Sequence, residues 1–157
     1  MSFSFPAAAS RPFPKDTMQV HPYLFFDGRC EEALELYQTA LGAEVVHLLR
    51  FRESPEPTMI PPGAEDKVMH ASFRIGDSII LASDGECQNR PAFQGFALSL
   101  MPPDDATGER LFAVLSEGGQ VVMPMAQTFF ASRFGMVTDR FGVMWLIVVA
   151  SDPNKNS

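Results

Sequence analysis

Three polar side chains, His70, Ser72 and Arg74, alternate with apolar ones in the segment Lys67 to Ile75. A period of two is typical of a strand, so these three side chains share one face. An imidazole in such a row can act as an acid or a base, or anchor an oxygen-rich ligand. The forked guanidinium of Arg74 suits a carboxylate or a phosphonate, although a surface arginine on an edge strand is the simpler interpretation. The row is the first candidate binding site.

Aromatic and imidazole side chains also gather near the first apolar segment of the chain. His21 stands beside Pro22, and together with Tyr23 and Phe25 it can point into a cavity. A lone histidine is more often a structural residue that is hydrogen-bonded or faces solvent. Trp145 is interpreted either as the wall of a cavity or as part of the core. His21, Tyr23 and Trp145 therefore join the candidate ligand-binding residues.

The remaining reactive side chains form no known catalytic arrangement. The sequence shows no Ser/His/Asp order, no supported Cys/His pair and no phosphate-binding loop that rises above chance. His47 is assigned to the exposed face of a strand because it lies between two apolar residues. The nine methionines would provide an adaptable apolar lining, but they do not identify a ligand.

The elements that must position these residues follow one another in the same order twice. In the first half, a strand is predicted over Val20 to Phe26, which ends at the turn dipeptide Asp27-Gly28. Apolar residues at helical spacing then predict a helix over Cys30 to Leu41, which ends at Gly42. Three strands follow, and a turn at Gly76-Asp77 joins the last two as a hairpin. Their predicted ranges are Ala43 to Phe51, Lys67 to Ile75 and Ser78 to Ser83.

The second half repeats this order. A strand over Gly95 to Met101 stops at two prolines, and Asp104 or Asp105 can cap the helix that follows. That helix is predicted near Asp105 to Glu117, before two glycines. Three strands complete the half, with predicted ranges Gln120 to Met125, Arg133 to Asp139 and Gly142 to Val149.

The repeated order predicts an α+β fold made of two βαβββ units with about eight main strands. An ordinary α+β domain with helices between its strands is the alternative. The expected boundaries are a flexible leader over residues 1–17 and a single domain over 18–150. Within it, the modules span about 18–84 and 95–150, and a polar tail covers 151–157.

Composition excludes several classes of partner. The chain has 12 lysines and arginines against 19 aspartates and glutamates, which leaves a net charge of −7. Such a surface repels nucleic acid and anionic membranes. The longest apolar run, Val143 to Ala150, is far shorter than the ~20 residues of a membrane helix. Cys30 and Cys87 lie far apart in the sequence, which is not the spacing of a zinc site or a disulfide framework. Both are interpreted as ordinary thiols in a reduced compartment. A soluble, cytoplasmic protein is expected.

Three separated segments resemble the PhnB-like family of the vicinal-oxygen-chelate superfamily, which includes glyoxalases, bleomycin-resistance proteins and dioxygenases. The segments are residues 21–46, with Tyr37 before Leu41-Gly42-Ala43; residues 68–84, with His70; and residues 128–149. The last segment matches at Gly135, Val137, Asp139, Phe141, Gly142 and Trp145, whereas Phe130 stands where relatives commonly carry tryptophan. The family is also described as 3-demethylubiquinone-9 3-methyltransferase-like, but the sequence has no glycine-rich nucleotide loop for a methyl donor.

The resemblance implies two curved mixed sheets around a cavity, in which many members of the superfamily hold a divalent metal. The usual His, Gln or Glu ligands come from the first strand of each unit and the last strand of the second. The corresponding positions here are His21, Gly95 and Leu146, or neighbours of the last two. Only His21 offers a ligand, and one imidazole does not retain a metal against water. We therefore expect no cofactor, although a divalent metal remains an open alternative.

Two functions follow from the resemblance. The first is a non-catalytic protein that binds a small molecule, as bleomycin-resistance relatives do in a groove between subunits. The alternative is a metal-dependent enzyme of the glyoxalase or dioxygenase type whose site is rebuilt from other residues, among them His21 and His70. A homodimer is expected in either case, because 14 phenylalanines and nine methionines give a small domain much bulky apolar surface.

Overall fold

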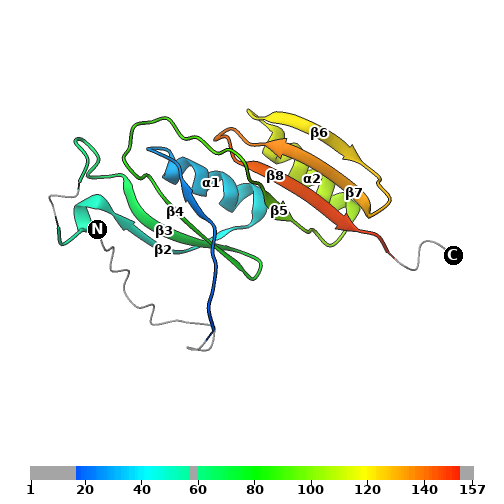
Figure 1. The fold of residues 1–157 in the computed structure, drawn as a ribbon, viewed down its shortest axis with the longest axis horizontal. Coiled ribbons are helices and arrows are strands. Elements are labelled where there is room, and N and C mark those ends of the chain that lie inside the picture. Colours follow the sequence, from blue (N-terminus) through cyan, green and yellow to red (C-terminus); the bar gives the residue numbers. More distant parts are fainter. Residues whose placement is uncertain (1–16, 57–59, 153–157) are drawn as a thin grey trace.

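The structure is a computed structural model that describes residues 17–56 and 60–152. Its elements follow the predicted order, strand, helix and three strands, in each half (Figure 1). The first module consists of β1 (Tyr23–Phe25), α1 (Cys30–Leu41), β2 (Glu44–Arg50), the short 3-10 helix η1 (Phe51–Glu53), β3 (Val68–Ile75) and β4 (Ser78–Ser83). The second consists of β5 (Leu98–Leu100), α2 (Asp105–Ser116), β6 (Gln120–Ala126), β7 (Ala131–Thr138) and β8 (Met144–Ala150).

Each module contributes one four-stranded mixed sheet. The strand order is β1-β4-β3-β2 in the first, which we call sheet A, and β5-β8-β7-β6 in the second, sheet B. In both sheets the first strand of the module pairs in parallel with its last strand, and the other pairs are antiparallel. Figure 1 shows the two modules side by side, each with its helix against its own sheet. The predicted α+β fold of two βαβββ units is confirmed.

At the start of helix α1, a buried carboxylate accepts hydrogen bonds from several backbone N–H groups. Asp84 follows β4 and is 1% exposed, and its Oδ1 accepts hydrogen bonds from the backbone N–H groups of Gly28 (2.9 Å) and Cys30 (2.7 Å). Its Oδ2 accepts one from Val68 at 2.8 Å. A carboxylate here satisfies free N–H groups at the helix start and ties them to β3 and β4. The helix ends at Gly42, whose φ of 67° is left-handed, as predicted.

Helix α2 begins and packs differently. The side chain of Asp104, rather than Asp105, accepts from the backbone N–H of Thr107 at 2.7 Å. The helix lies close to sheet B because Gly135 has no side chain. A Cβ atom at this position would lie 2.6 Å from the sulfur of Met125 and 2.9 Å from the Phe112 ring. The absence of a side chain at Gly135 therefore permits the close approach of helix and sheet.

A single core joins the two modules. Tyr37 of α1 donates a hydrogen bond to Oδ2 of Asp139 at 2.6 Å, and Nε1 of Trp145 donates to the same oxygen at 2.8 Å. The other oxygen of Asp139 accepts from the backbone N–H groups of Phe141 (2.9 Å) and Val143 (3.1 Å). The rings of Tyr37 and Trp145 meet edge to face at 5.3 Å. This contact links the helix of the first module to the last strand of the second.

Several predicted boundaries are wrong by a few residues. β1 excludes Val20, His21 and Pro22, because proline has no N–H to donate, although its carbonyl accepts from Leu81 at 2.9 Å. β5 begins only at Leu98, after Gly95 with its φ of +82°. The predicted leader and tail lie almost wholly outside the described residues. In the part of the chain that the structure describes, no helix is long and apolar enough to cross a membrane.

Candidate functional site

The side of sheet A that faces away from α1, its open face, carries most of the candidate residues. Helix α1 packs against the opposite side, where the Tyr37 ring stacks on Phe73 at 5.8 Å. Residues paired directly across strands share a face. The register pairs Tyr23 with Leu81, Leu81 with Ser72, and Ser72 with His47, which gives one row across all four strands.

Tyr23 and His70 form the central polar contact of this face. The Tyr23 hydroxyl and Nδ1 of His70 are 3.0 Å apart, and their rings are 5.7 Å apart. His70 is 9% exposed. On one side, the ring of Phe25 stacks on Tyr23 at 4.8 Å; on the other, His47 lies 6.2 Å from His70, centroid to centroid. The face therefore combines an exposed aromatic ring, a hydroxyl and two imidazoles.

Burial sets the charge state of the central pair. It lowers the pKa of His70, and the nearby His47 lowers it further, since both disfavour the imidazolium. Burial raises the pKa of Tyr23 by disfavouring the phenolate. At neutral pH both groups are therefore uncharged. An uncharged imidazole beside a hydroxyl can exchange hydrogen bonds with an oxygen-rich ligand and accept a proton from it.

The rest of the predicted polar row is less enclosed. Ser72 is half-buried within the row described above. Arg74 is exposed, and its Nη2 forms an ion pair with Oε2 of Glu44 at 2.5 Å. The interpretation of Arg74 as an edge-strand residue is wrong, because β3 lies between β2 and β4. Glu44, which was not among the predicted partners, pairs with the guanidinium, and Arg74 lies at the surface as the simpler interpretation had it.

The structure does not bring His21 and Trp145 to this contact. His21 precedes β1, and its Nε2 lies 3.0 Å from Oε1 of Gln19. Trp145 is 1% exposed and lies on the helix side of sheet B, where Asp139 holds its indole. A ligand would reach Trp145 only if the core opened. Of the six candidates, His70, Tyr23, Ser72 and Arg74 share one face.

The positions that correspond to the superfamily's metal ligands do not fit a metal ion. His21 forms a hydrogen bond with the side chain of Gln19, Gly95 has no side chain, and the side chain of Leu146 is apolar. Within residues 17–56 and 60–152, no three His, Cys, Asp or Glu side chains are grouped so that they could hold a metal. We derive no chemistry through a metal at these positions.

Sheet B has an open face of opposite character. Its register pairs Ser99 with Leu146, Leu146 with Met136, and Met136 with Met123. Met123 is 46% exposed, and other large apolar side chains of this module are exposed as well. They are Met101, Val121, Val122, Phe129 and Phe130. Phe129, Phe130 and Phe134 form a chain of ring contacts at 5.1 and 5.2 Å. This surface offers apolar contact rather than hydrogen bonding.

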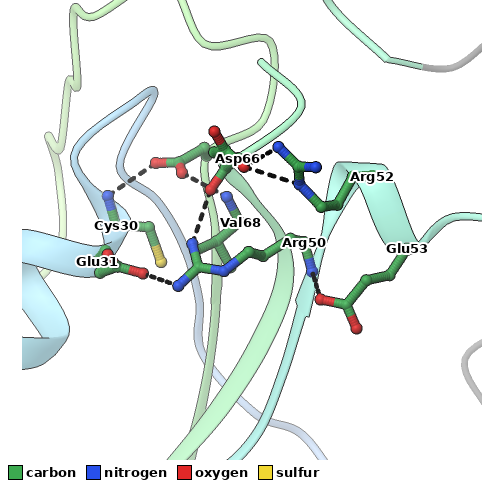
Figure 2. A network of polar contacts seen from close by, with 8 residues as sticks. Cys30, Glu31, Arg50, Arg52, Glu53, Asp66 and Val68 are labelled. Atoms are coloured by element: carbon green, nitrogen blue, oxygen red, sulfur yellow. Dashed lines mark hydrogen bonds and ion pairs between the residues drawn. The ribbon is translucent and has the colours of Figure 1, made fainter.

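Two hollows lie outside the Tyr23–His70 contact. The larger, of about 460 Å³, lies beside α1 and is lined by charged side chains. Figure 2 shows that several of these charges are already paired: Arg50 contacts Glu31 and donates to the carbonyl of Asp66 at 2.7 Å, and the Asp66 carboxylate binds Arg52. Lys67 donates to the carbonyl of Gly28 at 2.8 Å. The second hollow, of about 330 Å³, lies at the end of β1.

Residues that hold the site in place were partly missed from the sequence. The roles of Asp84 and Asp139 as hubs for buried donors were not predicted. Each of the two aspartates follows a strand and has a glycine within the next three residues. This pattern is the feature of the sequence that could have identified them. Their donors are up to 102 positions away along the chain, so the pattern does not reveal them.

Comparison with known proteins places the chain among close relatives. A family model described as 3-demethylubiquinone-9 3-methyltransferase matches residues 18–148. Protein YjdN of Escherichia coli (strain K12) is 36% identical over 147 residues, which cover 88% of this chain and 100% of YjdN. The crystal structure of protein PA1353 from Pseudomonas aeruginosa is 41% identical and covers 87% of this chain and 100% of PA1353, with a TM-score of 0.77.

Two further solved structures extend the likeness. The PhnB protein of Bacillus cereus is 25% identical and has a TM-score of 0.71, with 85% of this chain and 100% of that protein covered. FosX from Listeria monocytogenes, a fosfomycin resistance protein, is 13% identical and has a TM-score of 0.56, with 86% and 94% covered. At that identity only the fold is shared.

Proposed function

The chain belongs to the family described as 3-demethylubiquinone-9 3-methyltransferase, the PhnB-like family of the vicinal-oxygen-chelate superfamily. From this premise, we propose that it is a small-molecule-binding protein whose site lies on the open face of sheet A. The observation that carries the proposal is the uncharged Tyr23–His70 pair beside the 55% exposed ring of Phe25. Small-molecule sites combine apolar contact with a few placed polar groups, and here Phe25 supplies the first and the Tyr23–His70 pair the second.

The methyl transfer that the family's description names is no part of this proposal. The Tyr23–His70 pair binds hydrogen-bonding oxygen groups and has no feature specific to a methyl donor. Ser72 and His47 lie in the same row and add further donors and acceptors. The proposed ligand therefore carries oxygen atoms that reach this row while an apolar part contacts Phe25.

We propose that a second copy of the chain completes the site. The open face of sheet B is apolar and exposes Met123, and that of sheet A is a polar surface with an exposed aromatic ring. If sheet B of one copy covers sheet A of the other, a two-fold axis repeats the contact, so that both open faces of each copy are covered. A site of this kind would lie between subunits and exclude water from the Tyr23–His70 pair.

We propose that the protein is cytoplasmic, as its thiols suggest. Cys30 and Cys87 are both free, and burial raises the pKa of Cys87 to about 11. Two unreactive thiols support a place in the reducing cytoplasm.

A ligand screen on purified protein tests the proposed site. Small oxygen-bearing compounds would be screened by NMR against the wild type, His70→Gln, Tyr23→Phe and the control Arg52→Gln, whose exposed ion pair with Asp66 lies on η1. We expect hits whose binding weakens about two- to tenfold in the first two variants, because a lost hydrogen bond is worth about 0.5–1.5 kcal/mol, and stays unchanged in the control. Hits that bind all four proteins equally would refute the proposed site.

A further inference from the structure

The hollow of about 330 Å³ at the end of β1 joins the open face of sheet A through one side chain. Its apolar walls include Phe25, Pro91 and Ala92. Phe25 also belongs to the open face, since its ring stacks on Tyr23 at 4.8 Å. A ligand that contacts Tyr23 can therefore extend along Phe25 into the hollow. Aromatic and proline rings form flat apolar walls, and such walls suit a flat ring.

Arg90 brings a cation to this hollow. Its side chain is exposed, and it has no carboxylate partner among residues 17–56 and 60–152. In that part of the chain Arg110 and Arg140 also lack an ion pair, whereas the five other arginines are paired with Glu or Asp, namely Arg29, Arg50, Arg52, Arg74 and Arg133. The guanidinium of Arg90 therefore has its forked donors available for a carboxylate on a ligand.

The loop that carries Arg90 is held in a fixed conformation. Oδ1 and Oδ2 of Asp27 accept hydrogen bonds from the backbone N–H groups of Gln88 and Arg90, each at 3.0 Å. The backbone carbonyl of Asp27 accepts from Asn89 at 2.6 Å. Asp27, Cys87 and Asn89 have φ angles of 54°, 56° and 59°, which side-chain-bearing residues seldom adopt. Such a backbone persists where its surroundings hold it, so the backbone of Arg90 keeps its place relative to that of Phe25.

The acidic side chains of the hollow limit the charge that it accepts. Glu86 and Asp27 line it together with Arg90. Asp27 is engaged by the loop, and Glu86 accepts a hydrogen bond from the side chain of Gln88 at 3.0 Å. With Arg90 as the one cation among its lining residues, the hollow has a net charge of −1. An anion can therefore bind there only through direct hydrogen bonds to the Arg90 guanidinium, and a phosphate dianion is repelled more strongly than a monocarboxylate.

We infer that this hollow is a subsite for an aromatic monocarboxylate: the ring lies against Phe25 and Pro91, and the carboxylate binds Arg90. The inference rests on the proposed function, because the rest of the ligand reaches the Tyr23–His70 pair. It names the chemical class of the ligand, a flat ring with one carboxylate. Glu86 acts as the residue that discriminates against more highly charged anions.

The test uses three probes of one shape: 3-phenylpropanoate, the neutral 3-phenylpropanamide and 2-phenylethylphosphonate. Binding to the full chain is followed through backbone amide shifts in NMR spectra. We expect 3-phenylpropanoate to shift the amides of Phe25, Gly85 and Arg90 and to bind more tightly than the other two probes. Arg90→Gln should weaken its binding about tenfold, as loss of a charged hydrogen bond does, and Glu86→Gln should improve binding of the phosphonate.

Arg110→Gln on α2 is the matched control, with the same change in charge on the other module. Equal binding of the acid and the amide, or an Arg90→Gln effect no larger than that of Arg110→Gln, would overturn the subsite. Probe-induced shifts at Tyr23 and His70 alone would also overturn it, while leaving the proposed function supported. The proposed function is tested by the ligand screen with His70→Gln, and the subsite is tested by the Arg90→Gln variant. Failure of one proposal can therefore be told from failure of the other.

Discussion

Sheets A and B have the same strand order but opposite open faces. The face of sheet A carries Tyr23, His70 and Ser72, whereas the corresponding face of sheet B carries Met123 and Met136. Their helix-facing sides are alike, since each packs apolar side chains against its own helix and meets a buried aspartate hub. The difference indicates that the helix side determines the fold and leaves the open side free for binding. Substitutions on the two sides should therefore have different consequences.

The largest expected effect comes from the helix side. Asp139→Ala should lower the free energy of unfolding by about 3 kcal/mol or more, because four buried donors lose their acceptor. Urea denaturation measures this change. Asp77→Ala, in the exposed turn between β3 and β4, is the control and should stay within about 0.5 kcal/mol of the wild type. A loss below 1 kcal/mol for Asp139→Ala would show that the hub is not essential to the core.

A smaller effect is expected where α2 approaches sheet B. Gly135→Ala should destabilise the protein by about 1–3 kcal/mol, because the new methyl group overlaps Met125 and Phe112. The neighbouring Met136→Leu, on the open face of the same strand, should change the free energy of unfolding by less than about 0.5 kcal/mol. Thermal and urea unfolding of both variants compares the two sides of one strand. Equal effects would contradict the division between sides.

The open face of sheet A should contribute a dependence of stability on pH. The folded pKa of His70 lies below its unfolded value of about 6.5, so the unfolded state binds more protons between those two values. The contribution is therefore fully present above about pH 6.5 and is lost as the pH falls through the folded pKa. His47 and Tyr23 face His70, and Tyr23 stays protonated in this range.

Urea unfolding at several pH values between about 5 and 7 checks this dependence. The wild type should lose more stability over that range than His70→Gln does, while His21→Gln, whose ring contacts Gln19 away from this pair, serves as the control imidazole. Parallel curves for the wild type and His70→Gln would show that His70 is not buried enough to resist protonation.

The smallest effect is expected at the rim of the same face. Arg74→Gln removes an exposed ion pair with Glu44 and should change the free energy of unfolding by no more than about 1 kcal/mol. The expected change also shrinks in high salt, which screens exposed charges. Arg52→Gln breaks a comparable exposed pair and provides the reference value. A larger, salt-insensitive loss for Arg74→Gln would contradict the description of this ion pair as an exposed one.

Local patterns predicted most of the fold but little of the site. The helix Cys30–Leu41 was predicted to the residue, because apolar spacing and Gly42 both lie within the segment itself. The alternation in β3 correctly grouped His70, Ser72 and Arg74 on one face. A period of two does not tell which face a helix covers, so it left Trp145 open between wall and core. Contacts such as Tyr37 with Asp139 join residues 102 positions apart and leave no local pattern.

The central claim is that sheet B of one copy covers the polar face of sheet A of another. The most direct measurement is a nuclear Overhauser experiment on a mixture of two samples, one labelled only at methionine methyl groups and the other only at aromatic rings. We expect contacts between the methyl groups of Met123 or Met136 and the ring of Tyr23 or Phe25, which can arise only between copies. Contacts of these methyl groups solely with Phe130 or Phe134 of another copy, or none between copies, would contradict the claim.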